Sequence, residues 1–403
     1  GTSSWRVDRT IPMRAEELSN MVGSRRPRED KLCVSAVFNM DEKGNISREW
    51  FGKTIINSDR RYNYEEVQAM IEGADGDFKK ELLILNNMAI RLREERFKKG
   101  SIAFHTQEVK FVLDETGKPI DTYIKEQKEA NMLIEDFMLL ANRRVAEKIG
   151  RKTGDSKPKT FVYRIHDEPN PEKLQRFAEF LTKLGYKINL GTRKGLASSF
   201  NHLFDQIAGK GEENMIESIA IRTMSKAEYS TVNLGHYGLA FQYYTHFTSP
   251  IRRYPDLMVH RLLERYLAGK PSVNKDEYEE YCVHSSEMER KAVEAERASV
   301  KYKQAEFLMD KIGHAFNGLI SGVSKYGIYV ELEGSKCEGM VSLKYMDDDF
   351  YYLDDENYRV IGQHHGREFK LGDPVRIRVK RVDLQKKQMD FVLDSNGVDP
   401  KRR

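Results

Sequence analysis

The stretch YYTHFTSPIRRYPDLMVHR, residues 243–261, decides how the rest of the chain is interpreted. Pro250 fixes the backbone dihedral at its position, and proline is favoured where a helix begins. The hydroxyl residues Thr248 and Ser249 precede it, and Ser and Thr are preferred N-cap residues. We therefore expect a helix to begin directly after Pro250.

Two adjacent arginines, Arg252 and Arg253, follow that proline. A guanidinium offers a planar fork of donors that matches a phosphate, and the amides at a helix N-terminus add partial positive charge. The stretch therefore predicts an anion site. The alternative is a structural network in which both arginines pair with nearby acids such as Asp256.

Length, charge and cysteine content set limits on the class of protein. At 403 residues the chain exceeds one ordinary domain. The 67 Lys and Arg against 63 Asp and Glu leave a formal charge of +4, so any basic surface must be local. Cys33, Cys282 and Cys337 fit neither a disulfide framework nor a zinc site, which predicts a reducing cytoplasm. No apolar run approaches the roughly 18 residues of a membrane span, so we expect no membrane partner.

Hydrophobic periodicity predicts a mixed α/β body. Strands are expected at 31–38 and 46–56 around a turn, and at 109–113 and 161–165; helices are expected at 64–71, 81–98, 130–149, 172–184, 257–267 and 278–311. The last helix places small or apolar residues on one face, namely Met288, Ala292, Ala295, Ala298, Tyr302 and Ala305. We expect that face to dock on the body and the charged face to be solvated.

The pattern changes near residue 313 to short strands with glycine turns. The expected strands are 315–323, 327–332, 338–342, 374–383 and 389–393, which predict a small closed barrel of OB type. Phe316, Tyr326 and Tyr329 alternate with Lys325 and Lys344. A single-strand binder needs such a mixture, because bases stack on rings and phosphates meet cations. The alternative is that the rings fill the barrel core. The acidic insertion 347–355 is expected to be a solvated loop rather than a metal site, because no partner ligands surround it.

These motifs resemble the RNase II/RNase R (RNB) family of exoribonucleases. Besides residues 243–261, the opening GTSSW and IPMRAEELSN match the family. FNGLISGVSKYGIYVEL, EGMVSL and LGDPVRIRVKRVD are similar to its C-terminal RNA-binding domain. The resemblance implies an α+β chain: a mixed α/β catalytic domain incomplete at its N-terminus (1–312), an OB-fold domain (313–395) and a basic tail (396–403).

The resemblance also implies aromatic contacts to RNA. Trp5 stands where the family usually carries a tyrosine that stacks on the strand, and tryptophan offers at least as large a face. Phe104 matches the phenylalanine that brackets the stacked bases from the other side, and Tyr64 matches a tyrosine near the 3′ end. Without the resemblance, Tyr64 and Phe104 would be predicted as core residues.

Further matches concern the phosphate. Arg252 matches the arginine that contacts the scissile phosphate, where it would stabilise charge that develops in the transition state. Arg253, Thr248 and Ser249 are further candidates for the same pocket. Glu296, in EAERAS, matches a family acid close to the site whose role the sequence does not define.

Some candidates have a competing structural interpretation. Glu135 matches an acid that touches a ribose hydroxyl, and a carboxylate that accepts from a 2′-hydroxyl prefers RNA over DNA. Its alternative is a surface salt bridge with Arg143 or Lys128. His246 and His260 are expected to be packing or hydrogen-bonding residues rather than bases.

One departure from the family concerns metal ions. Such enzymes use a D-x-D-D cluster to hold divalent ions, and that cluster precedes the GTS segment, so we expect it upstream of Gly1 and no metal site in this chain. The complete enzyme is expected to use Mg²⁺ or Mn²⁺, to act as a monomer, and to hydrolyse single-stranded RNA processively from 3′ to 5′ into nucleoside 5′-monophosphates. This chain alone is expected to be inactive. The alternative is a catalytically silent RNA-binding protein on the same scaffold.

Overall fold

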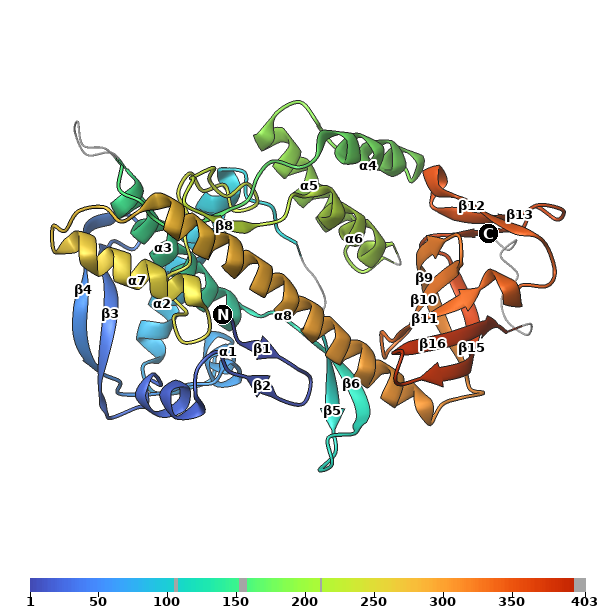
Figure 1. Cartoon of the computed structure of the whole chain (residues 1–403), viewed down its shortest axis with the longest axis horizontal. Helices are drawn as coiled ribbons and strands as arrows, with labels where there is room; N and C mark the ends of the chain where they lie inside the picture. Colours follow the sequence, from blue (N-terminus) through green and yellow to red (C-terminus); the bar gives the residue numbers. More distant parts are fainter. Residues whose placement is uncertain (105–107, 152–157, 211, 395–403) are drawn as a thin grey trace.

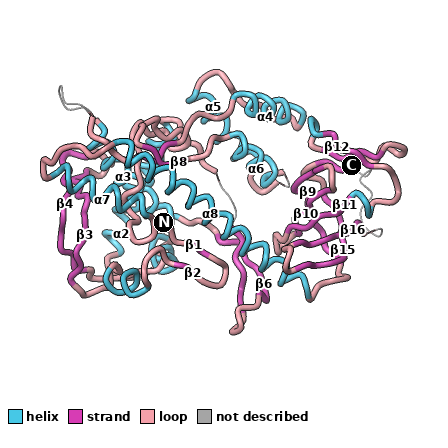
Figure 2. The backbone as a smooth tube through the Cα atoms, in the orientation of Figure 1, coloured by secondary structure: helices cyan, strands magenta, loops and turns pink. Residues whose placement is uncertain are grey.

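A computed structural model describes residues 1–104, 108–151, 158–210 and 212–394; the expected basic tail lies outside these residues. The described chain forms a larger, mainly helical part and a C-terminal β-barrel, and α8 (Lys275–Met309) runs between them (Figure 1). Figure 2 shows that the strands of the larger part lie among helices and loops, whereas the C-terminal part consists mainly of strands. The predicted order, a mixed α/β domain followed by an OB-fold barrel, is confirmed.

In the first half of the larger part, hydrogen bonds between residues close in the sequence fix a turn and the start of a helix. Its elements are β1 (Ser4–Trp5), β2 (Thr10–Ile11), a π-helical turn (Leu18–Val22), β3 (Asp30–Met40), β4 (Ile46–Asn57), α1 (Tyr64–Ile71), α2 (Lys79–Lys98), β5 (Glu108–Leu113), β6 (Pro119–Lys125) and α3 (Glu129–Gly150). Asp41 closes the β3–β4 turn, because its carboxylate accepts from the backbone N–H groups of Lys43 and Asn45. Asn63 and Glu66 form a capping box that begins α1 where the sequence predicts it.

The second half contains two helices that the sequence analysis did not anticipate. Its elements are β7 (Tyr163–Ile165), α4 (Pro171–Lys183), α5 (Arg193–Ile207), α6 (Glu213–Thr223), β8 (Glu228–Ser230) and α7 (Tyr254–Leu267). The unanticipated helices, α5 and α6, share one hydrophobic core with α4, in which Phe177 and Phe200 stack at 6.0 Å between ring centroids. A separate core packs α3 and α7 together. The three helices α4 to α6 extend toward the barrel (Figure 1), and Phe180 contacts Tyr358 there at 4.7 Å.

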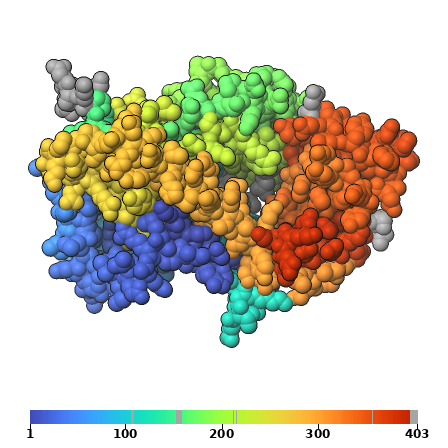
Figure 3. All heavy atoms as spheres, in the orientation of Figure 1, coloured from blue at the N-terminus to red at the C-terminus, as the bar shows by residue number. Residues whose placement is uncertain are grey.

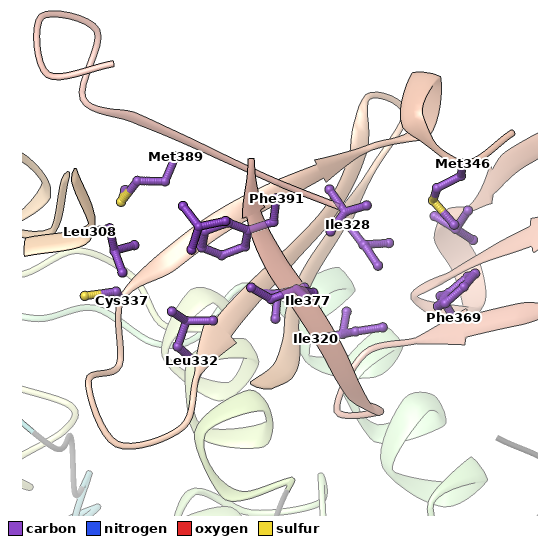
Figure 4. Close-up of a cluster of buried hydrophobic side chains, with 14 of the residues drawn as sticks. Leu308, Ile320, Ile328, Leu332, Cys337, Met346, Phe369, Ile377, Met389 and Phe391 are labelled. Atoms are coloured by element: carbon purple, nitrogen blue, oxygen red, sulfur yellow. The ribbon is translucent and has the colours of Figure 1, made fainter. Parts of the chain in front are cut away.

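The barrel closes in the strand order β10-β11-β16-β15-β9. The strands are β9 (Ala315–Ser324), β10 (Gly327–Leu332), β11 (Glu338–Ser342), β15 (Pro374–Asp383) and β16 (Gln388–Leu393), each within one residue of its expected range. All pairs are antiparallel except β11 with β16. Figure 4 shows the apolar interior, to which α8 contributes Leu308. The end of α8 is therefore part of the barrel core.

The prediction of a solvated loop at 347–355 is wrong. The insertion forms a three-stranded sheet of β12 (Tyr351–Asp354), β13 (Arg359–Gly362) and β14 (Glu368–Lys370), with 3-10 turns at Leu343–Tyr345 and Asp355–Asn357. The Asp349 side chain is fully covered. Although burial opposes its ionisation, N–H groups of His365, His364 and Phe350 lower the pKa of Asp349 to about 2. The carboxylate is occupied by these donors, so it holds the sheet to its loop.

The docking face predicted for α8 is only partly correct. The helix is buried at its two ends, by Cys282, Ser285 and Ser286 against the larger part and by Ala305, Phe307 and Leu308 against the barrel. Met288 and the alanines between are half-buried, and Tyr302 is exposed. The helix therefore bridges two bodies instead of lying along one. The division at 312/313 stays a prediction, since α8 ends at Met309 and β9 begins at Ala315.

None of the helices in the described ranges is both long and apolar enough to cross a bilayer.

Candidate nucleic-acid interface

Helix α7 begins later than predicted. Its first residue is Tyr254, Pro255 occupies the first turn, and Arg253 is the N-cap, without a side-chain capping bond. Ser249 is not a cap; its carbonyl accepts from the N–H groups of Arg252 and Arg253 at 3.2 and 3.1 Å. The segment after Pro250 is therefore a tight turn that presents two successive arginines in different directions.

Arg253 is held by a buried acid. Its Nε and Nη2 atoms each lie 2.8 Å from an oxygen of Asp256, a bidentate pair, and Asp256 is 0% exposed. Asp256 Oδ1 also accepts from the N–H of Ser249 at 2.7 Å. Burial works against the charge of Arg253, but Asp256 outweighs it and raises the pKa of the guanidinium. The structure thus places Arg253 and Ser249 in the acid-paired network that the sequence analysis gave as the alternative.

Arg252 has no such partner. No carboxylate in the described ranges lies within 4.0 Å of its guanidinium, which is half-buried and lies over the Trp5 ring at 5.1 Å from the ring centroid. Burial and the neighbouring Arg253 lower the pKa of Arg252, although a guanidinium remains charged in proteins. An unpaired, partly desolvated cation attracts anions strongly. Arg252 is therefore the member of the pair whose guanidinium no described carboxylate holds.

The N-terminal strand is tied to this turn. The N–H of Ser3 donates to the Arg252 carbonyl at 2.8 Å, and the N–H of Tyr254 donates to the Gly1 carbonyl at 3.0 Å. The N–H of Trp5 donates to Glu296 Oε1 at 2.9 Å, and the ring remains 44% exposed. Glu296 therefore positions Trp5. We call Trp5, Arg252 and Glu296 the Arg252 site.

Tyr64 and Phe104 differ in their surroundings. Tyr64 begins α1 and is 47% exposed, so the core interpretation is wrong for it, and its phenol contributes to the electrostatic environment of Arg252. Phe104 is half-buried against the α4–α6 core, with its ring centroid 5.4 Å from that of Phe204. The structure does not bring Phe104 into contact with Trp5, so a stacking role for Phe104 stays a prediction.

Glu135 is exposed on α3 and does not form the salt bridge that was its alternative interpretation. Its Oε2 accepts from Gln127 Nε2 at 2.8 Å, and in the described ranges no ion pair joins it to Arg143 or Lys128. Its proposed contact with a ribose hydroxyl stays a prediction.

The next residue, Asp136, was missed. It is buried between two arginines of α2, with Oδ1 3.0 Å from Arg96 Nη2 and Oδ2 3.3 Å from Arg93 Nε. Burial raises the pKa of Asp136 to about 6 against the opposing effect of both arginines. Its spacing from Leu133 and Leu140 on the buried helix face was the available signal. Asp136 therefore joins α3 to α2 through these two arginines.

The two histidines of the central stretch are hydrogen-bonding residues, as predicted. His246 Nδ1 lies 2.8 Å from the Tyr229 hydroxyl, and His260 Nε2 lies 2.7 Å from the Phe247 carbonyl. Burial lowers the pKa of both rings, well below the usual value for His246. Both are committed to internal partners.

The candidate aromatic residues of the barrel have different surroundings. Phe316 is half-buried and packs against the barrel core, which is the core-filling alternative. Tyr326 is 64% exposed, with Lys325 Nζ 5.1 Å from its ring centroid. Tyr326, Tyr329 and Lys325 line a groove of about 900 Å³, which we call the barrel groove. The groove is the second candidate surface for nucleic acid.

Binding of a metal ion would require a group of suitable side chains close together. In the described ranges, no group of three or more His, Cys, Asp or Glu could hold a metal ion.

The fold is an α/β domain joined to a closed β-barrel that carries a groove lined by cations and tyrosines. The RNB domain family matches residues 1–269, and the S1 RNA binding domain family matches residues 310–393. The chain therefore belongs to the RNB family.

Individual relatives are ribonucleases R. The chain is 36% identical to Ribonuclease R 1 of Lactococcus lactis over 411 residues, which cover 99% of this chain and 49% of that protein. It is similar to the structure of Mycoplasma genitalium RNase R in complex with ribose-methylated single-stranded RNA (TM-score 0.88, 26% identity, 98% of this chain and 62% of that one). Yeast Ssd1, a pseudonuclease, shares the fold (TM-score 0.69, 20% identity, 89% and 44%). The chain spans about half the length of the curated relatives it matches.

Proposed function

We propose that this chain is the C-terminal portion of a processive 3′→5′ exoribonuclease that hydrolyses single-stranded RNA to nucleoside 5′-monophosphates. One observation carries the proposal: the guanidinium of Arg252 is partly buried, stacked on the exposed ring of Trp5, and unpaired with any described carboxylate. Family membership supports the same conclusion.

The chemistry assigned to the Arg252 site follows from charge. Hydrolysis of a phosphodiester increases negative charge on the phosphoryl oxygens and the leaving oxygen in the transition state. Arg252 donates to the scissile phosphate and stabilises that charge, since donors fixed in a partly desolvated site need not reorganise during the reaction. Arg253 contributes indirectly, because its pair with Asp256 fixes the turn that aims Arg252.

Stacking positions the strand. The Trp5 ring stacks on a base beside the reacting phosphate, and Glu296 orients that ring through the backbone N–H of Trp5. In this proposal Tyr64 contacts the 3′ end, Phe104 stacks from the opposite side, and Glu135 accepts from a ribose 2′-hydroxyl. Tyr326, Tyr329 and Lys325 hold RNA in the barrel groove.

Divalent metal chemistry belongs to the complete protein in this proposal. Mg²⁺ or Mn²⁺ would be held by an acidic cluster upstream of Gly1, and the chain by itself would bind RNA without cleaving it. We also propose that the protein acts as a monomer in the cytoplasm, with its catalytic and OB-fold domains divided near residue 312.

The second candidate is a catalytically silent RNA-binding protein that keeps the Arg252 site and the barrel groove. The fold is compatible with it, because yeast Ssd1, a pseudonuclease, shares this scaffold.

The test is cleavage of 5′-labelled single-stranded RNA in Mg²⁺ by this chain, by a form extended upstream to the length of its relatives, and by the Arg252→Ala variant of the extended form. We expect shortening from the 3′ end by the extended form, and a loss of about 100- to 1,000-fold in kcat for the variant. An Arg252→Lys variant keeps the charge without the fork and should recover only part of the rate. If the extended form binds RNA and releases no mononucleotide, the silent RNA-binding protein replaces the nuclease.

A further inference from the structure

The barrel groove has a wall that does not belong to the barrel. Its barrel side is formed by the β9–β10 turn, β11 and the β15–β16 turn, and its other side by Arg297, Ala298 and Lys301 of α8. Figure 3 shows α8, in orange, between the blue N-terminal region and the red barrel strands. The groove therefore lies between two parts of the fold.

The charge of the groove is almost all positive. Its cations are Arg297, Lys301, Lys325, Lys344, Lys386 and Lys387. The acid that lines it, Glu338, accepts from the Ser321 hydroxyl at 2.7 Å. Arg297 and Lys301 are exposed, and within the described ranges neither has a carboxylate within 4.0 Å. These two charges are available to an outside anion.

The α8 wall is rigidly attached to the barrel. Ala305, Phe307 and Leu308, one to two turns beyond Lys301, are buried in the barrel core, and Figure 4 shows Leu308 there. Gln304 Nε2 also donates to the Lys336 carbonyl at 3.3 Å. Because a helix rises about 1.5 Å per residue, Lys301 lies only about 6 Å along α8 from this anchor. The groove is therefore preformed.

The Arg252 site lies on the other side of the same helix. Glu296 and Ser299 accept from the N–H groups of Trp5 and Val7. At 3.6 residues per turn, Lys301 is rotated about 140° from Glu296, and Arg297 about 160° from Ser299. A helix is about 10–12 Å across with its side chains. One face of α8 therefore supports Trp5 while the opposite face closes the barrel groove.

We propose that Arg297 and Lys301 bind the phosphates of a single RNA strand held in the barrel groove, as a second wall that the barrel alone does not supply. The proposal rests on the RNA-binding function above. The groove combines cations with two tyrosine rings, that of the exposed Tyr326 and that of Tyr329. This combination suits a single strand, because its phosphates pair with cations and its bases stack on aromatic rings. A strand that occupies both the groove and the Arg252 site passes around α8, so the helix separates anchoring from cleavage.

The test uses the intact chain and fluorescence anisotropy with a fluorescein-labelled 20-mer of single-stranded RNA over a range of salt concentrations. For Arg297→Glu/Lys301→Glu we expect binding to weaken by about tenfold or more, and the slope of log K against log salt to fall by about 1.4, the value for two lost phosphate contacts. The matched control is Lys291→Glu, a charge reversal on the same helix at an exposed position outside the groove.

The charge-preserving exchange Arg297→Lys/Lys301→Arg should retain wild-type affinity and slope. If the double reversal disturbs folding by circular dichroism, Arg297→Gln/Lys301→Gln is measured instead and should show the same drop in slope. Unchanged affinity and slope in the groove variants, or an equal loss in Lys291→Glu, overturns the proposal. Trp5→Ala and Arg252→Ala are measured in the same assay. If these two variants weaken RNA binding and the groove variants do not, the proposed function is retained and the role of Arg297 and Lys301 is rejected.

Discussion

The Arg252 site and the barrel groove hold their cations in opposite ways. At the first, a buried carboxylate locks Arg253 and leaves one guanidinium free, so a single charge is aimed at one point. In the second, six cations line an open groove with one acid among them. A fixed donor suits a reacting phosphate, whereas mobile surface charges supply affinity along a strand. The Arg252 site is therefore suited to contact one phosphate in a fixed geometry, and the barrel groove to attract several phosphates along a strand.

The largest effect should come from breaking the locked pair. Asp256→Ala leaves Arg253 and the Ser249 N–H buried without a partner, which should cost about 3–5 kcal/mol in the free energy of unfolding. Urea denaturation measures it. The groove comparison is Lys344→Ala, which should change stability by less than about 0.5 kcal/mol. Equal losses for the two variants would remove the distinction between the regions.

The next contrast separates the two kinds of barrel aromatic. Phe316→Ala removes a ring packed on the barrel core and should destabilise the protein by about 2–4 kcal/mol. Tyr326→Ala removes an exposed ring and should weaken RNA binding by about 1–3 kcal/mol, with an unchanged unfolding midpoint. Denaturation and anisotropy on both variants check this. A Phe316→Leu variant that restores stability but not RNA affinity would show that Phe316 also contacts RNA.

Acid should destabilise the region that supports the Arg252 site. Burial lowers the pKa of His166, and lowers the pKa values of His236 and His246 well below 6.5. Below pH 6.5 the unfolded chain binds protons that the folded chain does not, so stability falls as the pH decreases. Each ring contributes a slope of up to about 1.4 kcal/mol per pH unit. Denaturation between pH 5 and 7.5 measures the slope. The His246→Gln variant lacks one of the three rings, so its slope should be smaller by that ring's contribution of up to about 1.4 kcal/mol per pH unit. A stability that does not change with pH contradicts the prediction.

The smallest effect concerns the orientation of Trp5. Glu296→Ala removes the acceptor for the Trp5 N–H and should weaken RNA binding by about 1 kcal/mol, while Glu296→Gln keeps an acceptor and should lose less. Fluorescence of Trp5 in a Trp50→Phe background reports the change directly. If Glu296→Ala leaves both the spectrum and the affinity unaltered, Glu296 does not position the ring.

Local patterns predicted much of the fold. The five barrel strands alternate buried and exposed residues between glycine turns, and α1 carries its own capping box, so both were placed within a residue. Helices α5 and α6 were missed; their apolar positions pack in a core shared with α4 and with residues distant in the chain such as Ile102 and Phe104. The start of α7 was misplaced because Pro250 and Pro255 are both compatible with a helix N-terminus. Asp256 and the N-terminal strand decide between them.

The sequence by itself determined the α+β class, the barrel, and the presence of a paired-arginine stretch, since these depend on periodicity and on neighbours along the chain. Only the tertiary structure decided which arginine is free, because that depends on a buried Asp256 and on Trp5, 247 positions away from Arg252. It also decided that Phe316 faces the core and that α8 closes the barrel groove. Most of these contacts join segments far apart in the chain. The Arg253–Asp256 pair is local, but the sequence does not encode which of the two arginines turns toward the acid.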